Sequence, residues 1–410
     1  MTTLRKQWKQ ETVVAFTGHM MDRPGRTPPR FLPAKEQGVR AAIRKKLNTL
    51  SPKYGFSSAP CGGDILFLEE MLGLKREIHI VLPYEIEQFK ADCVTGFQHN
   101  RDHDWGVRFD QILQKATSVT ILSKYRAENN VMASECCNRT VLGMGLIKAK
   151  AMGTQLALLA LWDGWSGDAI GGTRTMVNLA ISLGVRVEYI RNLQPKKVND
   201  VLHASWPTSP SLPLPKNSAS AVEFPQEICA VLFADALRFS EIPEQQLPLF
   251  INEYLHPLGQ LIQQSRLHAF GPRDFNTWGD GLYCTFDSVG NAGRFALALQ
   301  KFVQSKNWKN LGFSAHFNLR IALHVGPVFR FPDPFMSKDS FLGSAINFAA
   351  RIEPKTPPGE IYCSEIFTAL AAAEGVSDFE CEHVSKLTLP KVDEAKQIFV
   401  LRAKGNPDPC

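Results

Sequence analysis

Several features are absent from this 410-residue sequence, and each absence excludes a class of protein. No run approaches the roughly 18 apolar residues that a membrane-spanning helix requires. The opening stretch MTTLRKQWKQETVV has no apolar core of signal-peptide length. We therefore expect a cytoplasmic protein without a membrane partner.

Cysteine motifs and basic tracts are also missing. The nine cysteines form no CxxC pair and have no histidines at zinc-site spacing, so we expect buried thiols in a reducing compartment. The net charge of +6 is spread along the chain. The short basic stretches at 5–9 and 44–46 are interpreted as solvated surface, which argues against a nucleic-acid partner.

The length and the 44% hydrophobic content suit two domains of ordinary size. Residues 12–190 alternate apolar, strand-like runs with amphipathic, helix-like segments. The strand-like runs include VVAFTG, EIHIVLPY, SVTILS, LALLALWD and VRVEYI. This alternation predicts an α/β domain: a Rossmann-like parallel sheet with helices on both faces.

Glycines lie at the ends of strand-like runs or at the starts of helix-like segments, where ligands of parallel sheets usually bind. They fall in three groups together with neighbouring polar residues: Gly18; Gly62, Gly63 and Asp64; and Gly171, Gly172 and Thr173. Glycine at such positions lets backbone N–H groups approach a phosphate at a helix N-terminus. Tight turns that need positive φ explain any one group equally well. The three groups together favour a nucleotide-like ligand.

This half resembles the SLOG superfamily of Rossmann-like domains, which sense or process nucleotide-derived ligands. The resemblance rests on FTGHMMDRP, SSAPCGGDILFLEE, IVLPYEIEQF and LALWDGWSGDAIGGT. Phosphoribohydrolase members carry GGxGTxxE with a catalytic glutamate, but the matching string here is GGTRTMVN, with Arg174 and Asn178 at the two key positions. The departure favours binding over hydrolysis.

A proline- and serine-rich stretch separates the two halves. WPTSPSLPLPKNSASA at 206–221 holds four prolines and four serines, which predicts an extended, solvated connector. We therefore divide the chain into a sensor domain at 12–192, a linker at 193–224 and a second domain at 225–404.

The second domain carries two aspartates at predicted strand ends. Asp235 closes the apolar run ICAVLFAD, and Asp280 lies in the glycine-flanked turn TWGDG. Two hard oxygen ligands of this kind suit Mg²⁺ or Mn²⁺ bound through carboxylates and substrate phosphates. Further on, Asn347 and Arg351 are four residues apart, so on a helix they share one face. They offer an amide to a ribose or phosphate oxygen and a guanidinium to developing negative charge.

Four ordered blocks make this half resemble the catalytic domain of class III adenylyl and guanylyl cyclases: FADALRF, WGDG, LRIALHVGPV, and GSAINFAARI followed by PPGEIYCSE. The resemblance implies an α+β, ferredoxin-like fold. It also implies conversion of a nucleoside triphosphate to a 3′,5′-cyclic nucleotide and pyrophosphate, with two Mg²⁺ or Mn²⁺ ions per active site.

The resemblance assigns roles to individual residues. It implies that Asp235, Asp280 and the carbonyl of Ala236 bind metal, and that Asn347 and Arg351 orient the ribose and stabilise the transition state. In the family the aspartates and the Asn/Arg pair come from opposite catalytic domains. A chain with one such domain is therefore expected to form a homodimer.

Four further positions concern the substrate. Asn276 and Ser340 match the two base-reading positions, where the family commonly has Lys with Asp or Glu with Cys. ATP is the default expectation, and a CTP or UTP cyclase of a bacterial antiviral defence system is the alternative. Arg238 stands where a glycine is usual and either binds triphosphate or points to solvent; Lys391 is a weaker triphosphate candidate. His324 is interpreted as a structural histidine.

Two rival functions stay open: an inactive nucleotide-binding module, and an N-terminal hydrolase with the cyclase domain as an accessory.

Overall fold

The structure is a computed structural model. It describes residues 13–27, 29–97, 104–126, 130–164, 171–190, 224–237, 239–311, 313, 317–392 and 394–404. Two separate sheets span residues 13–190 and 226–403. The predicted linker falls almost wholly outside the described residues, so the proposed domain boundaries stay predictions.

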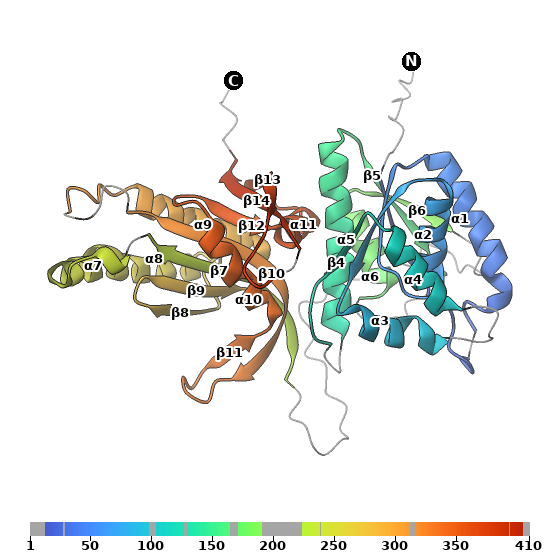
Figure 1. Ribbon diagram of the computed structural model, residues 1–410, viewed down its shortest axis with the longest axis horizontal. Helices are drawn as coiled ribbons and strands as arrows, with labels where there is room; N and C mark the ends of the chain where they lie inside the picture. The colour runs from blue at the N-terminus through green and yellow to red at the C-terminus, as the bar shows by residue number, and fades with distance from the viewer. Residues whose placement is uncertain are drawn as a thin grey trace.

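A six-stranded parallel sheet in the order β4-β3-β2-β1-β5-β6 forms the centre of the N-terminal domain (Figure 1). Its strands are β1 (Val13–Gly18), β2 (Tyr54–Ser57), β3 (Glu77–Leu82), β4 (Ser118–Ile121), β5 (Leu156–Leu161) and β6 (Arg186–Ile190). The unbroken apolar runs of β1 and β5 are typical of strands that are covered on both faces. The strand order reverses at β1, between β2 and β5, which is where such folds leave a crevice for ligands.

Helices cover both faces of this sheet, as the sequence predicts. They are α1 (Glu36–Leu50), α2 (Gly63–Gly73), α3 (Ile86–Cys93), α4 (Trp105–Lys115), α5 (Val131–Ala151) and α6 (Thr173–Ser182). Helices α1, α2 and α4 pack with Val14 and Phe16, whereas α5 and α6 pack with Val13 and Ala15. Alternate residues of β1 therefore serve two separate cores.

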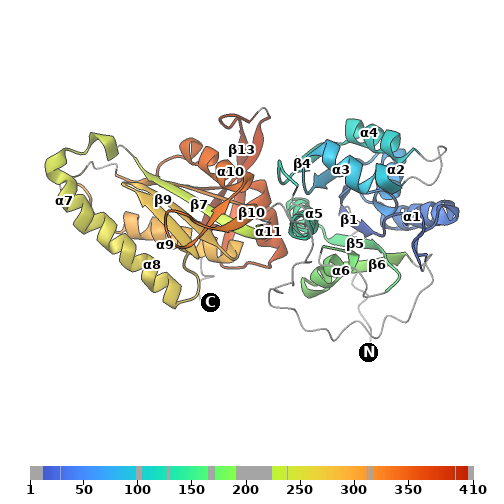
Figure 2. The same ribbon diagram turned by 90° about the horizontal axis from the view of Figure 1, so that it is seen from below.

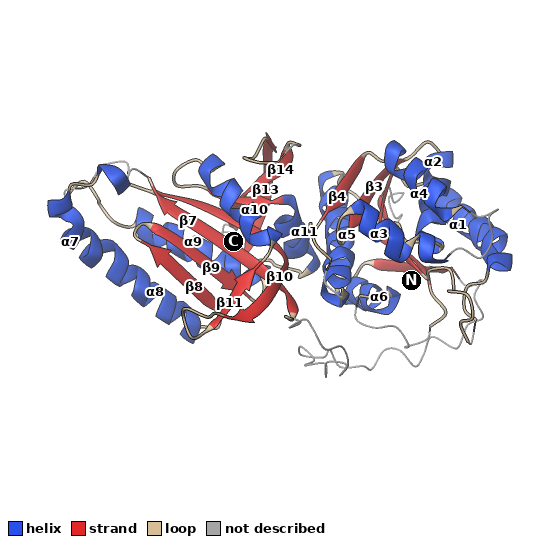
Figure 3. Ribbon diagram, turned by 60° about the horizontal axis from the view of Figure 1, so that its bottom comes forward, coloured by secondary structure: helices blue, strands red, loops and turns tan. Residues whose placement is uncertain are grey.

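The C-terminal domain is built on a mixed sheet in the order β13-β14-β12-β10-β7-β9-β8, with β11 paired to β10 (Figure 3). Its strands are β7 (Gln226–Ala236), β8 (Asp274–Trp278), β9 (Gly281–Phe286), β10 (Leu319–Pro332), β11 (Asp339–Leu342), β12 (Ile361–Ser364), β13 (Phe379–Leu387) and β14 (Lys396–Ala403). Strands β10 and β12 run parallel, and the other pairs are antiparallel.

The helices of this domain are divided between the two faces of the sheet. They are α7 (Leu247–Phe250), α8 (His256–Leu267), α9 (Val289–Gln304), α10 (Ser344–Ile352) and α11 (Glu365–Ala373). Helices α8, α9 and α11 bury Leu232 and its neighbours on one face. On the other face α10 packs on Val231 through Ala349. This α+β arrangement confirms the predicted fold class, and the face that carries α10 also carries the candidate active site.

The two domains meet through α5 and α11, which lie side by side in both views (Figures 1 and 2). Their backbones approach so closely that a Cβ atom added at Gly143 would lie 1.9 Å from the carbonyl oxygen of Ala369. Residues of both helices belong to one buried cluster that continues across the domain boundary. None of the helices in the described ranges has the length and apolar character needed to cross a bilayer.

Candidate active site and N-terminal cavity

Two aspartates lie together at one end of the C-terminal sheet. Asp235 is the penultimate residue of β7, and Asp280 occupies the turn between β8 and β9, where Gly279 has a positive φ of 86°. Burial and the neighbouring charge of Asp235 raise the pKa of Asp280 to about 6. Two carboxylates held this close repel one another, so their ionised forms require a nearby positive charge.

Arg320 on β10 supplies positive charge to this cluster. It stands opposite Asp235 in the β7–β10 ladder, and its Nη2 lies 2.5 Å from Oδ2 of Asp235. Its Nε lies 2.7 Å from Oε1 of Glu353, which directly follows α10. Arg320 lies in the block LRIALHVGPV but was not among the site residues that the sequence pattern indicated. The signal that was available is its position at the start of a strand that pairs with the Asp235 strand.

The residues present fit a divalent cation. Burial raises the pKa of Glu353 to about 7; Arg320 acts to lower this pKa, and the charges of Asp235 and Asp280 act to raise it. Three carboxylates and one arginine therefore form one electrostatic cluster. Within the described ranges, no group of three Asp, Glu, His or Cys side chains is arranged to hold a metal ion by itself. Carboxylates that need further oxygen ligands suit Mg²⁺ or Mn²⁺ shared with phosphate oxygens. Ala236 is buried beside Asp235, opposite Leu319.

Asn347 and Arg351 lie on the outward side of α10. Ala345, Ala349 and Ile352 bury the opposite side of the helix against the sheet, while Asn347 is exposed and Arg351 half-buried. The structure gives neither of them a hydrogen bond or ion pair within the described residues, and it does not bring them into contact with the two aspartates. Asn347 and Arg351 therefore lie on one face of α10, as predicted, and this face points away from the C-terminal sheet.

Of the two proposed base-reading residues, Asn276 lies on the same side of the sheet as α10. Ser340 adjoins Phe341, which packs with Ala345 of α10, so the Ser340 side chain projects from the other face of β11. Trp278 packs on Phe233, with ring centroids 6.2 Å apart, and Phe233 belongs to the cluster beneath α10. Asn276 is two residues before Trp278 on β8, so it projects to that face and is exposed. Ser340 lies on β11 and is half-buried.

Of the two residues proposed to bind triphosphate, the structure describes Lys391 but not Arg238. Lys391 is exposed in the loop between β13 and β14, with a positive φ of 57°. The neighbouring Leu389 packs in one cluster with Ile352 at the end of α10, which places this loop near the Arg351 end of the helix. Arg238 lies outside the described residues, so its role stays a prediction.

His324 has the structural role that the sequence predicts. It is buried on β10, its Nδ1 lies 2.7 Å from Oγ of Ser364, and its ring packs on Phe348 at a tilt of 37°, with centroids 4.5 Å apart. Burial lowers the pKa of His324 to about 3, so the ring is neutral at physiological pH. Ser364 also caps α11 by accepting a hydrogen bond from the N–H of Phe367.

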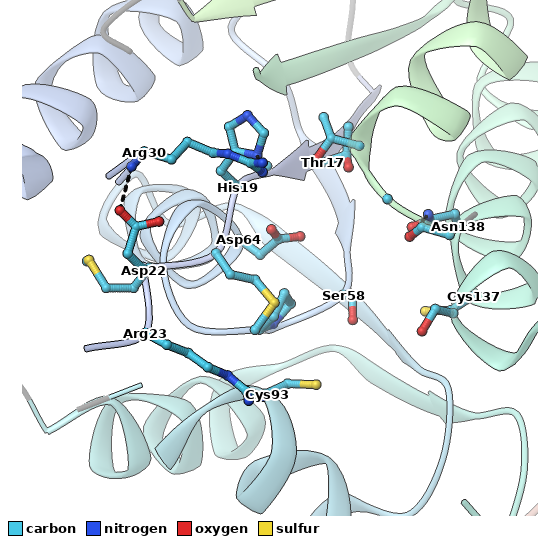
Figure 4. Close-up of a pocket in the computed structure, with 18 of the residues that line it drawn as sticks. Thr17, His19, Asp22, Arg23, Arg30, Ser58, Asp64, Cys93, Cys137 and Asn138 are labelled. Carbon is cyan, nitrogen blue, oxygen red and sulfur yellow. Dashed lines mark hydrogen bonds between the residues drawn. The ribbon is translucent and has the colours of Figure 1, made fainter. Parts of the chain in front are cut away.

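A cavity of about 680 Å³ opens at the carboxyl ends of the N-terminal strands. Its walls come from the segments that follow β1, β2 and β5 and from the first half of α5. Figure 4 shows Asp64 between the His19 side of the cavity and the side formed by Cys137 and Asn138 of α5. The cavity therefore lies at the reversal of strand order, where the fold predicts a ligand site.

The predicted glycines divide into two groups in the structure. Gly18, Gly171, Gly172 and Thr173 line the cavity together with Asp64. Gly62 and Gly63 are not among the residues that line it. A Cβ at Gly62 would lie 2.6 Å from the backbone nitrogen of Met21, and the Gly63 N–H donates to the carbonyl of His19. These two glycines permit close packing under the loop after β1, which agrees with the turn alternative.

Charged residues on the loop after β1 add a feature that the sequence analysis did not identify. Arg23, Arg26 and Arg30 all line the cavity. Arg30 donates from Nη1 to Nδ1 of His19 across 3.0 Å, and Nε2 of His19 lies 3.1 Å from Oδ1 of Asp163. The cationic loop faces the N-terminus of α6 across a space large enough for a nucleotide. Trp162 is buried near Tyr189, and Trp165 lies outside the described residues.

Comparisons with known proteins give one family match. Residues 222–402 match the family model described as the adenylate and guanylate cyclase catalytic domain. A comparison with curated protein sequences found no match.

Several solved cyclase structures are similar to this part of the chain. The adenylyl cyclase CyaB from P. aeruginosa is 17% identical over 46% of this chain and 100% of its own, with a TM-score of 0.39. The guanylate cyclase domain of RhGC from Catenaria anguillulae, in complex with GTP, is 17% identical over 44% of this chain and 100% of its own, with a TM-score of 0.36. Adenylate cyclases from Trypanosoma brucei in their monomeric state are 16% identical over 45% of this chain and 94% of their own, with a TM-score of 0.36. Residues 222–402 of this chain therefore match the adenylate and guanylate cyclase catalytic domain family, and the α+β fold of this half agrees with that match.

Proposed function

We propose that this protein is a nucleotidyl cyclase that converts a nucleoside triphosphate to a 3′,5′-cyclic nucleotide and pyrophosphate. The observation that carries the proposal is the cluster of Asp235 and Asp280 with Arg320, at the sheet end of a domain that matches the cyclase family. The reaction is attack of the 3′-hydroxyl of the substrate on its own α-phosphate. It needs no side-chain nucleophile.

In this proposal Asp235, Asp280 and the carbonyl of Ala236 hold two Mg²⁺ or Mn²⁺ ions. When bound, the ions lower the pKa of the 3′-hydroxyl and neutralise charge on the phosphates. Arg320 already orients the Asp235 carboxylate, and Glu353 holds Arg320 from the other side. Asn347 orients the ribose, and Arg351 donates to the negative charge that develops at the α-phosphate.

We infer that two copies of the chain build the site together. Asn347 and Arg351 face away from the sheet that carries Asp235 and Asp280, so a second domain facing α10 would receive them. Large apolar side chains on the same domain support a partner surface: Trp278, Phe335, Met336 and Leu342 are 57%, 90%, 55% and 60% exposed. Exposure of this extent on one domain suits burial against a second copy.

ATP is the proposed default substrate, with CTP or UTP as the alternative. Asn276 carries both a donor and an acceptor, and Ser340 can rotate its hydroxyl, so the pair does not impose the fixed pattern of Lys with Asp or Glu with Cys. The Asn276 side chain is exposed, and among the described residues its Oδ1 accepts a hydrogen bond from the adjacent Thr277 N–H alone, at 3.0 Å. A role in bacterial antiviral defence goes with the pyrimidine alternative.

The N-terminal cavity is proposed to bind a phosphorylated, nucleotide-like ligand without hydrolysing it. The α6 N-terminus at Gly172 and Thr173 offers backbone donors, and the arginines of the loop after β1 offer positive charge. Asn178 stands where hydrolases of the resembling superfamily have their catalytic glutamate. An N-terminal hydrolase is therefore the weaker reading.

Ligand binding is proposed to regulate the cyclase through α5. Ser134, Cys137 and Asn138 of this helix line the cavity, and Gly143 lies against Ala369 of the cyclase domain less than two turns later. Ser364, the N-cap residue of α11, contacts His324, and the His324 ring packs on Phe348 beside Asn347. A displacement of α5 would therefore reach the helix that carries Asn347 and Arg351 through packed side chains.

One assay tests the central proposal. Purified protein is incubated with Mn²⁺ and each of ATP, GTP, CTP and UTP, and cyclic products are identified by mass. A cyclic nucleotide that disappears in the Asp280→Asn variant supports the proposal. Absence of every cyclic product, while nucleoside triphosphates still stabilise the protein in thermal unfolding, would support the inactive nucleotide-binding alternative.

A further inference from the structure

The hairpin of β10 and β11 is fixed to the edge strand β8 by a partly buried ion pair. Nζ of Lys338, directly before β11, lies 2.6 Å from Oδ1 of Asp274 and 3.1 Å from the carbonyl oxygen of Phe275. The Asp274 side chain is only 11% exposed. Strands β8 and β11 share no backbone ladder, so this side-chain contact joins two segments that the sheet itself leaves independent.

Both partners stand two residues from a proposed base-reading position. Asp274 and Asn276 project from the same face of β8, because alternate strand residues share a face. Lys338 and Ser340 have the same spacing at the start of β11. The ion pair therefore lies about 7 Å along each segment from the residue proposed to contact the base.

A second contact restrains the other face of the hairpin. The Arg273 guanidinium lies over the Phe341 ring, 5.0 Å from its centroid, and Phe341 is buried. Arg273 directly precedes Asp274 at the start of β8, and Ser340 and Phe341 are neighbours on β11. The hairpin is thus held to the start of β8 through Lys338 in its turn and through Phe341 on β11, next to the position proposed for the nucleotide base.

We infer that Lys338 is a positioning residue that sets the separation between Asn276 and Ser340, and with it the selectivity among bases. This inference rests on the proposed cyclase function. Asn276 and Ser340 are short side chains, so their reach is limited and a change of strand separation changes which base edge they can contact together. Selectivity arises when polar groups pair with one base and are left unpaired by another. Lys338 itself need not touch the substrate.

The test compares Lys338→Met with Lys338→Arg in the full-length protein. Methionine keeps the length of the side chain and removes its charge and donors, whereas arginine retains both. Activity is measured with Mn²⁺ and each of the four triphosphates. Lys338→Met is expected to change by about tenfold the ratio between the kcat/KM of the best substrate and that of the second-best, which corresponds to the loss of one hydrogen bond. The change should appear in KM, and Lys338→Arg should recover part of it. Asp274→Asn, which keeps the shape of Asp274, should change the ratio in the same direction.

Arg294→Met is the matched control, because it removes an ion pair with Asp378 at the exposed end of α9, away from the α10 face. It should leave all four ratios unchanged. Equal losses for every triphosphate in Lys338→Met would overturn the inference and leave the ion pair a purely structural role. The same ratios can be read from thermal stabilisation by each triphosphate, which needs no turnover. A protein without cyclase activity therefore refutes the proposed function and still tests the positioning role.

Discussion

Arg320 and Asp235 face each other across the β7–β10 ladder, and the guanidinium of Arg320 also reaches Glu353 at the end of α10. This pairing joins the candidate metal site on the sheet to the helix that carries Asn347 and Arg351. The candidate site within one chain is therefore organised around one arginine.

Replacing Arg320 by methionine should destabilise the protein by about 1–3 kcal/mol, because two partly buried carboxylates lose their cationic partner. A divalent cation can supply the lost charge, so Mn²⁺ should raise the melting temperature of the variant more than that of the wild type. Arg402→Met, which removes an exposed pair with Glu360, should cost less than about 1 kcal/mol and show no added Mn²⁺ effect. Equal Mn²⁺ effects on Arg320→Met and wild type would contradict this view of the cluster.

Catalysis should require residues from two chains. Asp280→Ala and Arg351→Ala should each abolish activity, and an equimolar mixture should recover roughly a quarter of the wild-type rate, since half of the dimers then contain one intact site of two. Mixing Asp280→Ala with Asp235→Ala is the control, because both changes lie in the same half-site and recovery should be absent. If verified mixed dimers of Asp280→Ala and Arg351→Ala recover no activity, the shared-site proposal is wrong.

The contact between the domains should tolerate no side chain at Gly143. Gly143→Ala places a methyl group against the Ala369 carbonyl, so the helices must separate, at a cost of about 1–3 kcal/mol that exceeds the gain in helix propensity. Calorimetry should show two separated unfolding transitions in place of a coupled one, and the cyclase rate should change. A Cβ at Gly259 of α8 would meet nothing within 4 Å, so Gly259→Ala should be neutral or slightly stabilising. Identical behaviour of the two variants would argue against tight interdomain packing.

Asp64 should make stability depend on pH. Burial raises its pKa to about 8 from an ordinary value of 3.8, against the opposing effect of the Ser57 hydroxyl, which donates to Oδ1 across 2.8 Å. Between these two pH values the folded protein holds a proton that the unfolded chain has released, so the free energy of unfolding falls as pH rises through this window. Asp64→Asn removes the titration and keeps an acceptor for Ser57. The variant should gain melting temperature over wild type, and the gain should be larger at pH 8 than at pH 5. A gain that does not vary with pH would show that Asp64 is ionised in the fold.

Base preference should respond to the two proposed reading positions. Asn276→Lys combined with Ser340→Asp installs the adenine pattern and should move the product ratio toward cyclic AMP. GTP should be a poor substrate of the wild type, because Asn276 and Ser340 do not reproduce the Glu and Cys pattern. An unchanged ratio of the four cyclic products in the double variant would mean that these positions do not read the base.

The sequence by itself determined the local features of this protein. Continuous apolar runs gave the strands β1, β5 and β7, the turn TWGDG placed Asp280 between two strands, and the spacing of Asn347 and Arg351 put both on one helix face. These follow from short-range geometry, because strand and helix periods fix which residues share a face. The pattern did not identify β2, which is four residues long and contains a glycine, nor the helices α3 and α4.

Only the tertiary structure decided which of these features meet. It separated Gly62 and Gly63, which pack under a loop, from Gly18, Gly171 and Gly172, which line the cavity. It placed Arg320 opposite Asp235, Lys338 on Asp274 and Gly143 against Ala369, contacts between residues that are 64 to 226 positions apart in the chain. Such pairings depend on strand order, register and helix packing. These are set by the burial of whole surfaces, and no local sequence pattern encodes them.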